Sequence, residues 1–254
     1  MPDPTPWLET VGRDRPEPAA VVLVAHGGKA HSTASAHRRG LAHRRMLPFA
    51  RSLERAGRPH RTGLGSGVAV YVLRYRFKGW NGPATDAYRD AAWAVAEIAR
   101  RHPDRPIVLV GHSLGGRAVL RAADGPGVIA VCALAPWLDG TDPVAQLAGR
   151  AVLVAHGDRD RMTDPAASYE FALRARATTA RVARFEVLGD GHAMLRRARE
   201  WHALVRRFVL GEIGAEPLDR SITNAVREPA PAGLRVALGA GEHPGPDGSR
   251  EQKE

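Results

Sequence analysis

The segment Pro106–Gly116, PIVLVGHSLGG, decides the fold of this chain. Its first part, Ile107–Val110, holds only β-branched residues and leucine, which is typical of a parallel strand buried on both faces. The motif GHSLG follows at 111–115, and a helical pattern begins after it. A strand-to-helix turn this sharp strains the residue at its apex, Ser113, and leaves no room for side chains at the two flanking glycines. The sequence therefore predicts a turn that lifts the hydroxyl of Ser113 clear of the backbone.

Length and composition are those of a single soluble domain. The chain has 254 residues, of which 44% are hydrophobic and 25% charged, enough for one large core. No apolar run approaches the roughly 18 residues that cross a bilayer, and the first residues lack the pattern of a signal peptide. The single Cys132 lies in an apolar run and excludes an internal disulfide. We therefore expect a cytoplasmic protein that does not bind membranes.

The formal net charge of +10 raises the question of a nucleic-acid partner. Of the 37 basic side chains only Lys29, Lys78 and Lys253 are lysines, so 34 are arginines. They are scattered along the chain and are not gathered with aromatic residues into one stripe. A solvated surface explains them, and we expect no nucleic-acid partner.

Strand-like runs alternate with helical patterns along the chain. The helical patterns cover Met46–Ala56, Thr85–Arg101 and Ala193–Leu210, the last with Leu195 facing inward, and Asp164 is expected to cap a helix from Pro165 to Arg176. This alternation predicts the α/β class, with a doubly wound, mostly parallel six-stranded sheet and helices on both faces. The six runs are Ala20–Ala25, Val68–Leu73, Ile107–Val110, Val128–Leu134, Ala151–Ala155 and Arg181–Val187, the last read as nearer an edge.

We divide the chain into three parts. Residues 1–19 are expected to be an N-terminal extension, and residues 20–215 the folded domain. Residues 216–254 are rich in proline, glycine and charge, so we expect a mostly disordered tail, with 234–238 too short to change this.

A serine nucleophile needs a base within hydrogen-bond distance. Among 11 histidines His192 is best placed, in the motif GDGH at 189–192 between the last strand and the last helix. His112 is adjacent to Ser113, but the turn separates neighbouring side chains, so we assign it to packing. His26 and His156 are expected to brace loops through hydrogen bonds.

The base in turn needs a carboxylate. The loop HGDRDRMTD at 156–164 offers three aspartates. Asp164 is already assigned as a helix cap, and Asp158 is expected to hold the loop closed. Asp160 is free to reach the next loop and is our choice, with Asp158 and then Asp139 as the alternatives.

Other groups at the same edge of the sheet complete a candidate site. The amide of Leu114 lies at a helix N-terminus, and HGG at 26–28 lets a backbone amide approach a substrate closely, so both can stabilise an oxyanion. Loops at the strand ends supply a possible substrate rim, namely Trp80, Arg117, Trp137 and Met162. Basic residues near this edge, taken either as solvated surface or as a site for anionic substrates, are Arg74, Arg76, Lys78, Arg117, Arg159 and Arg161.

Four motifs in this order, HGG at 26–28, GHSLG at 111–115, HGDRD at 156–160 and GDGH at 189–192, resemble the α/β-hydrolase fold superfamily. The resemblance covers Ala20–Leu210 and lies near the dienelactone hydrolase, small esterase and prolyl-oligopeptidase-like branches. It implies a nucleophile, acid and base at Ser113, Asp160 and His192, and oxyanion amides at Gly28 and Leu114. The opening hairpin of such sheets is expected to be reduced or missing, and Pro136–Arg150 leaves no room for a sizeable cap.

The expected function is that of a serine hydrolase cleaving carboxylic esters or thioesters of small molecules through an acyl-enzyme, with no cofactor and no metal. The same triad also serves amide cleavage, lyase or cofactor-free haloperoxidase-type chemistry, and the fold also occurs in non-catalytic binding proteins. The sequence leaves open the substrate, the acyl chain length and the oligomeric state. It also leaves open whether His31–Arg45 forms a lid.

Overall fold

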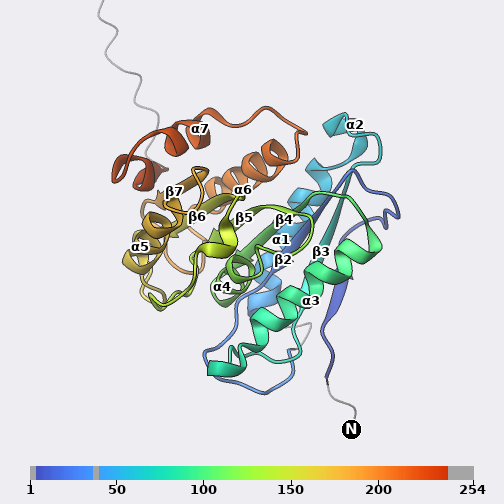
Figure 1. Cartoon of the computed structure of the whole chain (residues 1–254), viewed down its shortest axis with the longest axis horizontal. Helices are drawn as coiled ribbons and strands as arrows, with labels where there is room; N and C mark the ends of the chain where they lie inside the picture. Colours follow the sequence, from blue (N-terminus) through green and yellow to red (C-terminus); the bar gives the residue numbers. More distant parts are fainter. Residues whose placement is uncertain (1–3, 37–39, 240–254) are drawn as a thin grey trace, which may run out of the picture.

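The computed structural model of the chain describes residues 4–36 and 40–239. Its centre is one eight-stranded sheet in the order β1-β3-β2-β4-β5-β6-β7-β8, with the predicted α/β architecture (Figure 1). Only β1 is antiparallel to its neighbour, β3. The strands are β1 (Trp7–Thr10), β2 (Ala20–Ala25), β3 (Val68–Arg74), β4 (Ile107–His112), β5 (Val128–Leu134), β6 (Ala151–Gly157), β7 (Val182–Val187) and β8 (Val236–Leu238).

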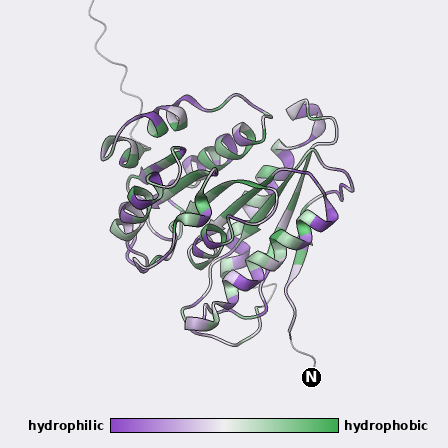
Figure 2. Ribbon diagram, viewed as in Figure 1, coloured by the Kyte–Doolittle hydropathy of each residue, from purple (hydrophilic) through white to green (hydrophobic). Residues whose placement is uncertain are grey.

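Helices cover both faces of the sheet, as predicted (Figure 1). On one face α1 (Leu41–Ala56), α6 (Ala198–Glu212) and α7 (Arg220–Arg227) pack against the strands, and on the other α3 (Asp86–Arg101), α4 (Leu114–Arg121) and α5 (Pro165–Arg176). Alternate residues of each central strand enter the two apolar clusters, so these strands are hydrophobic throughout (Figure 2). Short helical turns are α2 (Pro59–Thr62), η1 (Gly82–Ala84), η2 (Ala145–Leu147) and η3 (Ala232–Leu234).

The start of α5 agrees with the prediction, because the Asp164 carboxylate accepts the N–H of Ala166 at 2.8 Å ahead of Pro165. The start of α6 does not agree. The helix begins at Ala198 rather than Ala193, and Leu195, expected to face inward, is 70% exposed. Met194 has a φ of 55°, so the chain turns just before the helix.

The predicted six strands are extended to eight by one short strand at each edge. Residues 7–10, from the expected N-terminal extension, pair with β3 from Trp7↔Arg74 to Thr10↔Tyr71. The reduced opening hairpin is therefore a single antiparallel strand of four residues. At the opposite edge β8 pairs in parallel with β7, so β7 lies next to the edge strand, in agreement with its prediction as a strand nearer an edge.

The expectation of a mostly disordered tail is wrong for residues 216–239. Asp219 caps α7 by accepting the N–H of Ser221 at 2.9 Å, and Leu234 is fully buried. The buried guanidinium of Arg184 on β7 donates to the Leu234 carbonyl at 2.8 Å. Buried apolar residues such as Leu234 keep this segment folded against the domain, although its composition is typical of a disordered segment. The remainder of the predicted tail, 240–254, lies outside the described residues.

No cap covers the carboxyl ends of the strands between β5 and β6, where the segment 136–150 forms only the short turn η2. Part of the segment 31–45, for which the sequence leaves a lid role open, is attached beside this edge. Ser32 donates its N–H to the Asn81 side chain at 2.8 Å, and Ala34 accepts the N–H of Lys78 at 3.0 Å. Residues 41–45 begin α1, and 37–39 lie outside the described residues. None of the helices described is both long and apolar enough to span a bilayer.

Candidate active site

The turn between β4 and α4 has the conformation that its sequence predicts. Ser113 has φ 56° and ψ −122°, a strained backbone for a residue with a side chain. A Cβ on Gly111 would lie 2.3 Å from the carbonyl oxygen of Gly115, and one on Gly115 would lie 2.6 Å from that of His26. Both glycines are therefore required by direct backbone contacts, which confirms the steric reason given for them.

Ser113, His192 and Asp160 form a chain of hydrogen bonds at the carboxyl ends of β4, β7 and β6. The Oγ of Ser113 lies 3.0 Å from Nε2 of His192, and Nδ1 of His192 lies 2.8 Å from Oδ2 of Asp160. Ser113 and Asp160 are each 9% exposed. Residues distant in sequence thus meet because parallel strands bring their following loops to one edge.

The carboxylate of Asp160 is surrounded by donors. Its Oδ1 accepts the N–H of Met162 at 2.8 Å and of Thr163 at 3.0 Å, and its Oδ2 accepts the Thr163 hydroxyl at 2.8 Å. Nε2 of His156 lies 3.3 Å from the same Oδ2. Burial opposes ionisation, but hydrogen bonds from His156, His192 and the two amides outweigh it and hold the pKa of Asp160 well below its usual range. The group is therefore an oriented, ionised carboxylate.

Thr163 is a site residue that the sequence analysis missed. Besides its bond to Asp160, its Oγ1 lies 3.1 Å from Nδ1 of His192 and 3.2 Å from Nε2 of His156. It thus joins both imidazoles to the carboxylate. Thr163 follows Asp160 by three residues, and an aspartate in a loop often accepts hydrogen bonds from backbone amides a few residues later. This spacing is the sequence signal that points to Thr163.

The other aspartates bond elsewhere. The exposed Asp158 accepts the N–H of Gly189 at 2.7 Å and so ties the two loops together. Asp139 accepts from Arg117 and from the Thr141 hydroxyl at 2.6 Å.

His112 connects the serine turn to the histidine loop. Its Nε2 lies 2.9 Å from the backbone carbonyl of His192, so it donates an N–H there. Burial, together with the nearby His192, lowers the pKa of His112 to about 3, so the ring is neutral. It therefore positions His192 in addition to the expected packing. The predicted bracing role of His26 and His156 agrees with Nδ1 contacts of 2.8 Å to the Gly27 carbonyl and 2.9 Å to the Ser168 hydroxyl.

A cavity of about 170 Å³ lies over Ser113, and Gly28 and Leu114 line it with His192. Within the part of the chain described, neither the Gly28 nor the Leu114 N–H donates to a protein acceptor. A Cβ on residue 28 would lie 2.4 Å from the Lys78 carbonyl oxygen, so only glycine fits there. Two unsatisfied amides beside a serine hydroxyl are suited to binding a negatively charged oxygen.

Two of the proposed rim residues form a packed aromatic wall. Trp80 and Trp137 meet edge to face, with ring centroids 6.3 Å apart. The guanidinium of Arg117 lies 4.4 Å from the Trp80 centroid and pairs with Asp139 and, at 2.7 Å, with Asp142. Arg117 is only 4% exposed, so it supports the wall rather than offering a free charge. The wall borders a pocket of about 520 Å³, here the tryptophan pocket, lined by Ala30, His31, Trp80, Gly82, Pro83, Thr85, Arg117, Arg121, Trp137 and Asp139.

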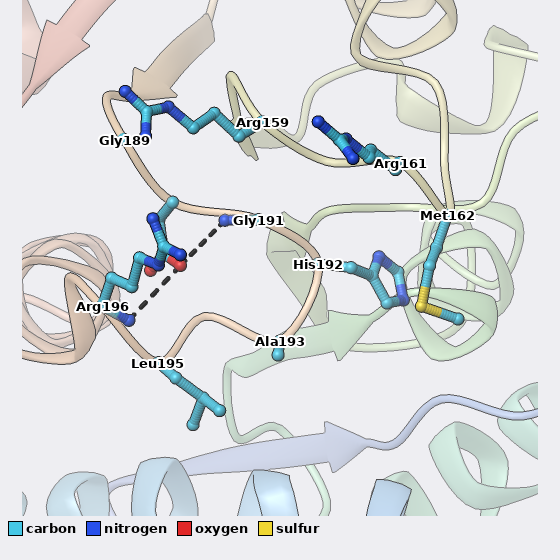
Figure 3. A pocket seen from close by; sticks show the side chains of 10 residues that line it. Arg159, Arg161, Met162, Gly189, Gly191, His192, Ala193, Leu195 and Arg196 are labelled. Atoms are coloured by element: carbon cyan, nitrogen blue, oxygen red, sulfur yellow. Dashed lines mark hydrogen bonds between the residues drawn. The ribbon is translucent and has the colours of Figure 1, made fainter.

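Another pocket, of about 560 Å³, opens beside His192 (Figure 3). Met162, the fourth proposed rim residue, is 78% exposed and stands beside His192 at the end of this pocket. We call it the arginine pocket. Its lining residues are Arg159, Arg161, Met162, Gly189, Asp190, Gly191, His192, Ala193, Leu195 and Arg196.

Solved structures with a similar fold include several esterases. A ferulic-acid complex of Est1E from Butyrivibrio proteoclasticus has 17% sequence identity and a TM-score of 0.57, covering 82% of this chain and 95% of that one. The esterase Est2 from Thermogutta terrifontis, bound to propionate, has 15% identity and a TM-score of 0.57, covering 84% and 91%. XC6422 from Xanthomonas campestris, a serine hydrolase without a lid, has 22% identity and a TM-score of 0.53, covering 80% and 87%. At such identities the likeness establishes the fold.

Sequence comparison identifies the family. No curated protein sequence matches the chain significantly. The sequence model of the alpha/beta hydrolase family, however, matches residues 11–251, which is nearly the whole chain. With the sheet order and the serine turn, this match shows that the chain belongs to the alpha/beta hydrolase family.

Proposed function

We propose that the chain is a serine hydrolase of small carboxylic esters or thioesters, with Ser113 as nucleophile, His192 as base and Asp160 as acid. The observation that carries this proposal is the continuous hydrogen-bonded chain from the Ser113 hydroxyl to the Asp160 carboxylate, beside two unpaired amides. Family membership supports hydrolytic chemistry, and the esterases of similar fold favour an ester substrate.

The proposed reaction begins at the serine hydroxyl. Nε2 of His192 accepts the proton of Ser113 as Oγ attacks the carbonyl carbon of the substrate. Nδ1–H of His192 donates to Asp160 throughout, which fixes the tautomer and stabilises the imidazolium that forms. The amides of Gly28 and Leu114 donate to the developing oxyanion in the cavity over Ser113.

Collapse of the intermediate breaks the bond to the leaving oxygen or sulfur, which takes the proton from His192. Water, activated by the same histidine, then hydrolyses the acyl-enzyme and restores the serine. The uncovered edge between β5 and β6 leaves the cavity open to substrates that diffuse in from solution.

The test is the change Ser113→Ala. Hydrolysis of 4-nitrophenyl butyrate and of a butyryl thioester should fall by roughly 10⁴-fold or more, because the nucleophile is lost. A fluorophosphonate should label the wild-type protein on the peptide that holds Ser113 and should not label the variant.

The matched control is Ser66→Ala, since Ser66 is exposed and distant in sequence from every proposed site residue. This variant should retain full turnover and labelling. Equal turnover by purified Ser113→Ala and wild-type protein would refute the proposed function.

A further inference from the structure

Three pockets follow one another along the carboxyl edge of the sheet. The cavity over Ser113 shares Met162 and His192 with the arginine pocket. On its other side it shares Ala30 and Trp137 with the tryptophan pocket. A substrate whose carbonyl sits at Ser113 therefore has one pocket for each of its two halves.

The direction of proton transfer assigns the halves. In the proposed function, which this inference assumes, Nε2 of His192 gives its proton to the leaving oxygen, so the leaving group must lie on the side of His192. That is the side of the arginine pocket. The acyl group then extends past Ala30 toward the aromatic wall of Trp80 and Trp137.

Three arginine side chains line the arginine pocket. Arg159, Arg161 and Arg196 line it, and all three are exposed. Among residues 4–36 and 40–239, none of the three guanidinium groups has a carboxylate within ion-pair distance or a side-chain hydrogen bond. Figure 3 shows Arg159 and Arg161 along one side of the pocket, opposite Ala193 and Leu195, with Arg196 at the end away from His192.

The carboxylate among the lining residues is engaged with other groups. Asp190 lines the pocket but is only 3% exposed. It accepts N–H groups from Gly191 at 2.8 Å, Arg197 at 2.9 Å and the Trp201 indole at 3.0 Å. Its charge is thus used to hold the loop that carries His192.

Two other arginines near this edge pair with carboxylates. Arg76 pairs with Asp90 at 2.5 Å and with Asp86 at 3.2 Å. Arg117 pairs with Asp139 and Asp142, as described above. These two paired arginines support the fold, whereas the three that face the arginine pocket have no carboxylate partner among the described residues.

Apolar side chains also border this pocket. Met162 and Leu195 are 78% and 70% exposed, among the most exposed large apolar side chains of the residues described. An exposed leucine alone is ordinary, but both border the same pocket. The apolar stem of a ligand would contact Met162 beside His192 and Leu195 further along the pocket, while its anionic end meets the guanidinium groups.

We propose that the arginine pocket binds the leaving group of the substrate, an alcohol or thiol whose far end carries a carboxylate or phosphate. Ser113 forms the new ester bond to the acyl carbon, the bond from that carbon to the leaving oxygen or sulfur breaks, and the leaving atom receives the proton that His192 took from Ser113. The anionic alcohol or thiol departs, and water releases the acid. Specificity for anions thus belongs to the leaving group and not to the acyl group.

The test uses esters of one acyl group and matched phenols. The wild-type protein is assayed with 4-(carboxymethyl)phenyl butyrate, its phosphonomethyl analogue and the neutral 4-(carbamoylmethyl)phenyl butyrate. The methylene isolates the charge from the reacting oxygen. At low salt kcat/KM should be roughly fivefold to tenfold higher for the anionic esters, and 0.5 M salt should remove the gain. Comparing carboxylate with phosphonate shows which anion is preferred.

The same carboxylate is then moved to the other half, in 4-(carbamoylmethyl)phenyl hemiglutarate. No gain over the neutral butyrate is expected. A gain for this ester, or equal kcat/KM for the anionic and neutral leaving groups, would overturn the proposal.

A variant with Arg159→Gln, Arg161→Gln and Arg196→Gln should bring the anionic-to-neutral ratio of kcat/KM close to one. Arg51→Gln is the matched control, because Arg51 is exposed on α1 and lines none of the three pockets. It should keep the wild-type ratio.

Failure of the proposed function gives a different result, namely no turnover of any of these esters. In that case the anionic pocket is tested by ligand binding, without turnover. Calorimetry with the free product, 4-hydroxyphenylacetate, should detect a complex with the wild-type protein that the triple variant loses. Absence of binding to the wild-type protein would contradict the anionic pocket independently of activity.

Discussion

At the scale of single residues, the two aspartates of the loop after β6 have distinct tasks. Asp160 accepts from two backbone amides and a hydroxyl and lies 2.8 Å from His192. Asp158 is exposed and accepts the N–H of Gly189 at 2.7 Å. The two carboxylates are only two positions apart, yet Asp160 faces the proposed base and Asp158 connects two loops.

The change Asp160→Asn tests this distinction. The amide would favour the His192 tautomer with its proton on Nε2, which cannot take the proton of Ser113. We expect kcat/KM for 4-nitrophenyl butyrate to fall roughly 10³–10⁴-fold. The matched change Asp158→Asn keeps an oxygen acceptor for Gly189 and should cost less than about tenfold. If Asp158→Asn proved the more damaging of the two, the acid would be misassigned.

At the scale of elements, the edges of the sheet depend on very short strands. Strand β8 has three residues and pairs with β7 from Phe185↔Val236 to Val187↔Leu238. Arg176 at the end of α5 donates to the carbonyls of Glu228 at 2.7 Å and Ala225 at 2.8 Å, and Leu234 is fully buried. The segment after α7 is thus part of the folded domain.

Removal of all residues after 227 should therefore destabilise the protein. The deletion exposes β7, removes the buried side chain of Leu234 and takes an acceptor from the buried Arg184. Together these losses amount to about 3 kcal/mol or more, or a fall in melting temperature of roughly 6 °C or more. Thermal unfolding followed by circular dichroism measures the change.

Two point changes give the matched comparison in the full-length chain. Leu234→Ala should lower the free energy of unfolding by about 2–5 kcal/mol, as for other buried leucines. Leu218→Ala removes the same atoms from a side chain that is 48% exposed and should cost less than about 1 kcal/mol. Equal effects of the two changes would show that the segment does not dock on β7.

At the scale of the whole molecule, buried neutral histidines link stability to pH. Burial is the largest cause that lowers the pKa values of His26 and His112 to about 3. In the unfolded chain the ordinary value is about 6.5. Below that pH these histidines bind protons in the unfolded state but stay neutral in the folded state. Their contribution to the free energy of unfolding is therefore fully present above about pH 6.5 and is lost as the pH falls toward 3.

Each of these histidines should therefore contribute a loss of about 1.4 kcal/mol per pH unit within that window. Urea denaturation at pH 6 and pH 5 should show this dependence. In His112→Gln the slope should be smaller by about that amount, whatever the variant's absolute stability. His60→Gln, which changes an exposed histidine, should keep the wild-type slope. An unchanged slope in His112→Gln would mean that His112 takes up protons equally well in both states.

The sequence by itself determined the features that depend on local sterics and periodicity. The apolar runs gave the parallel core of the sheet, Asp164 and Pro165 gave the start of α5, and the glycines of GHSLG gave the strained turn at Ser113. The order of motifs also singled out Asp160 and His192, whose chemical roles stay a prediction. For the strands, the helix cap and the turn, the evidence lies within a few residues of the feature.

Only the tertiary structure decided which distant groups meet. Strands β1 and β8 are too short to be stable alone, so their existence depends on the neighbours that pair with them. The bond from His112 to the His192 carbonyl spans 80 positions. Arg117 and Arg161 look alike in the sequence, yet packing buries the first between two aspartates and leaves the second facing a pocket. Ion pairs and edge-strand pairings between distant residues cannot be read from the local sequence, because the fold and not the neighbouring residues sets the position of the partner.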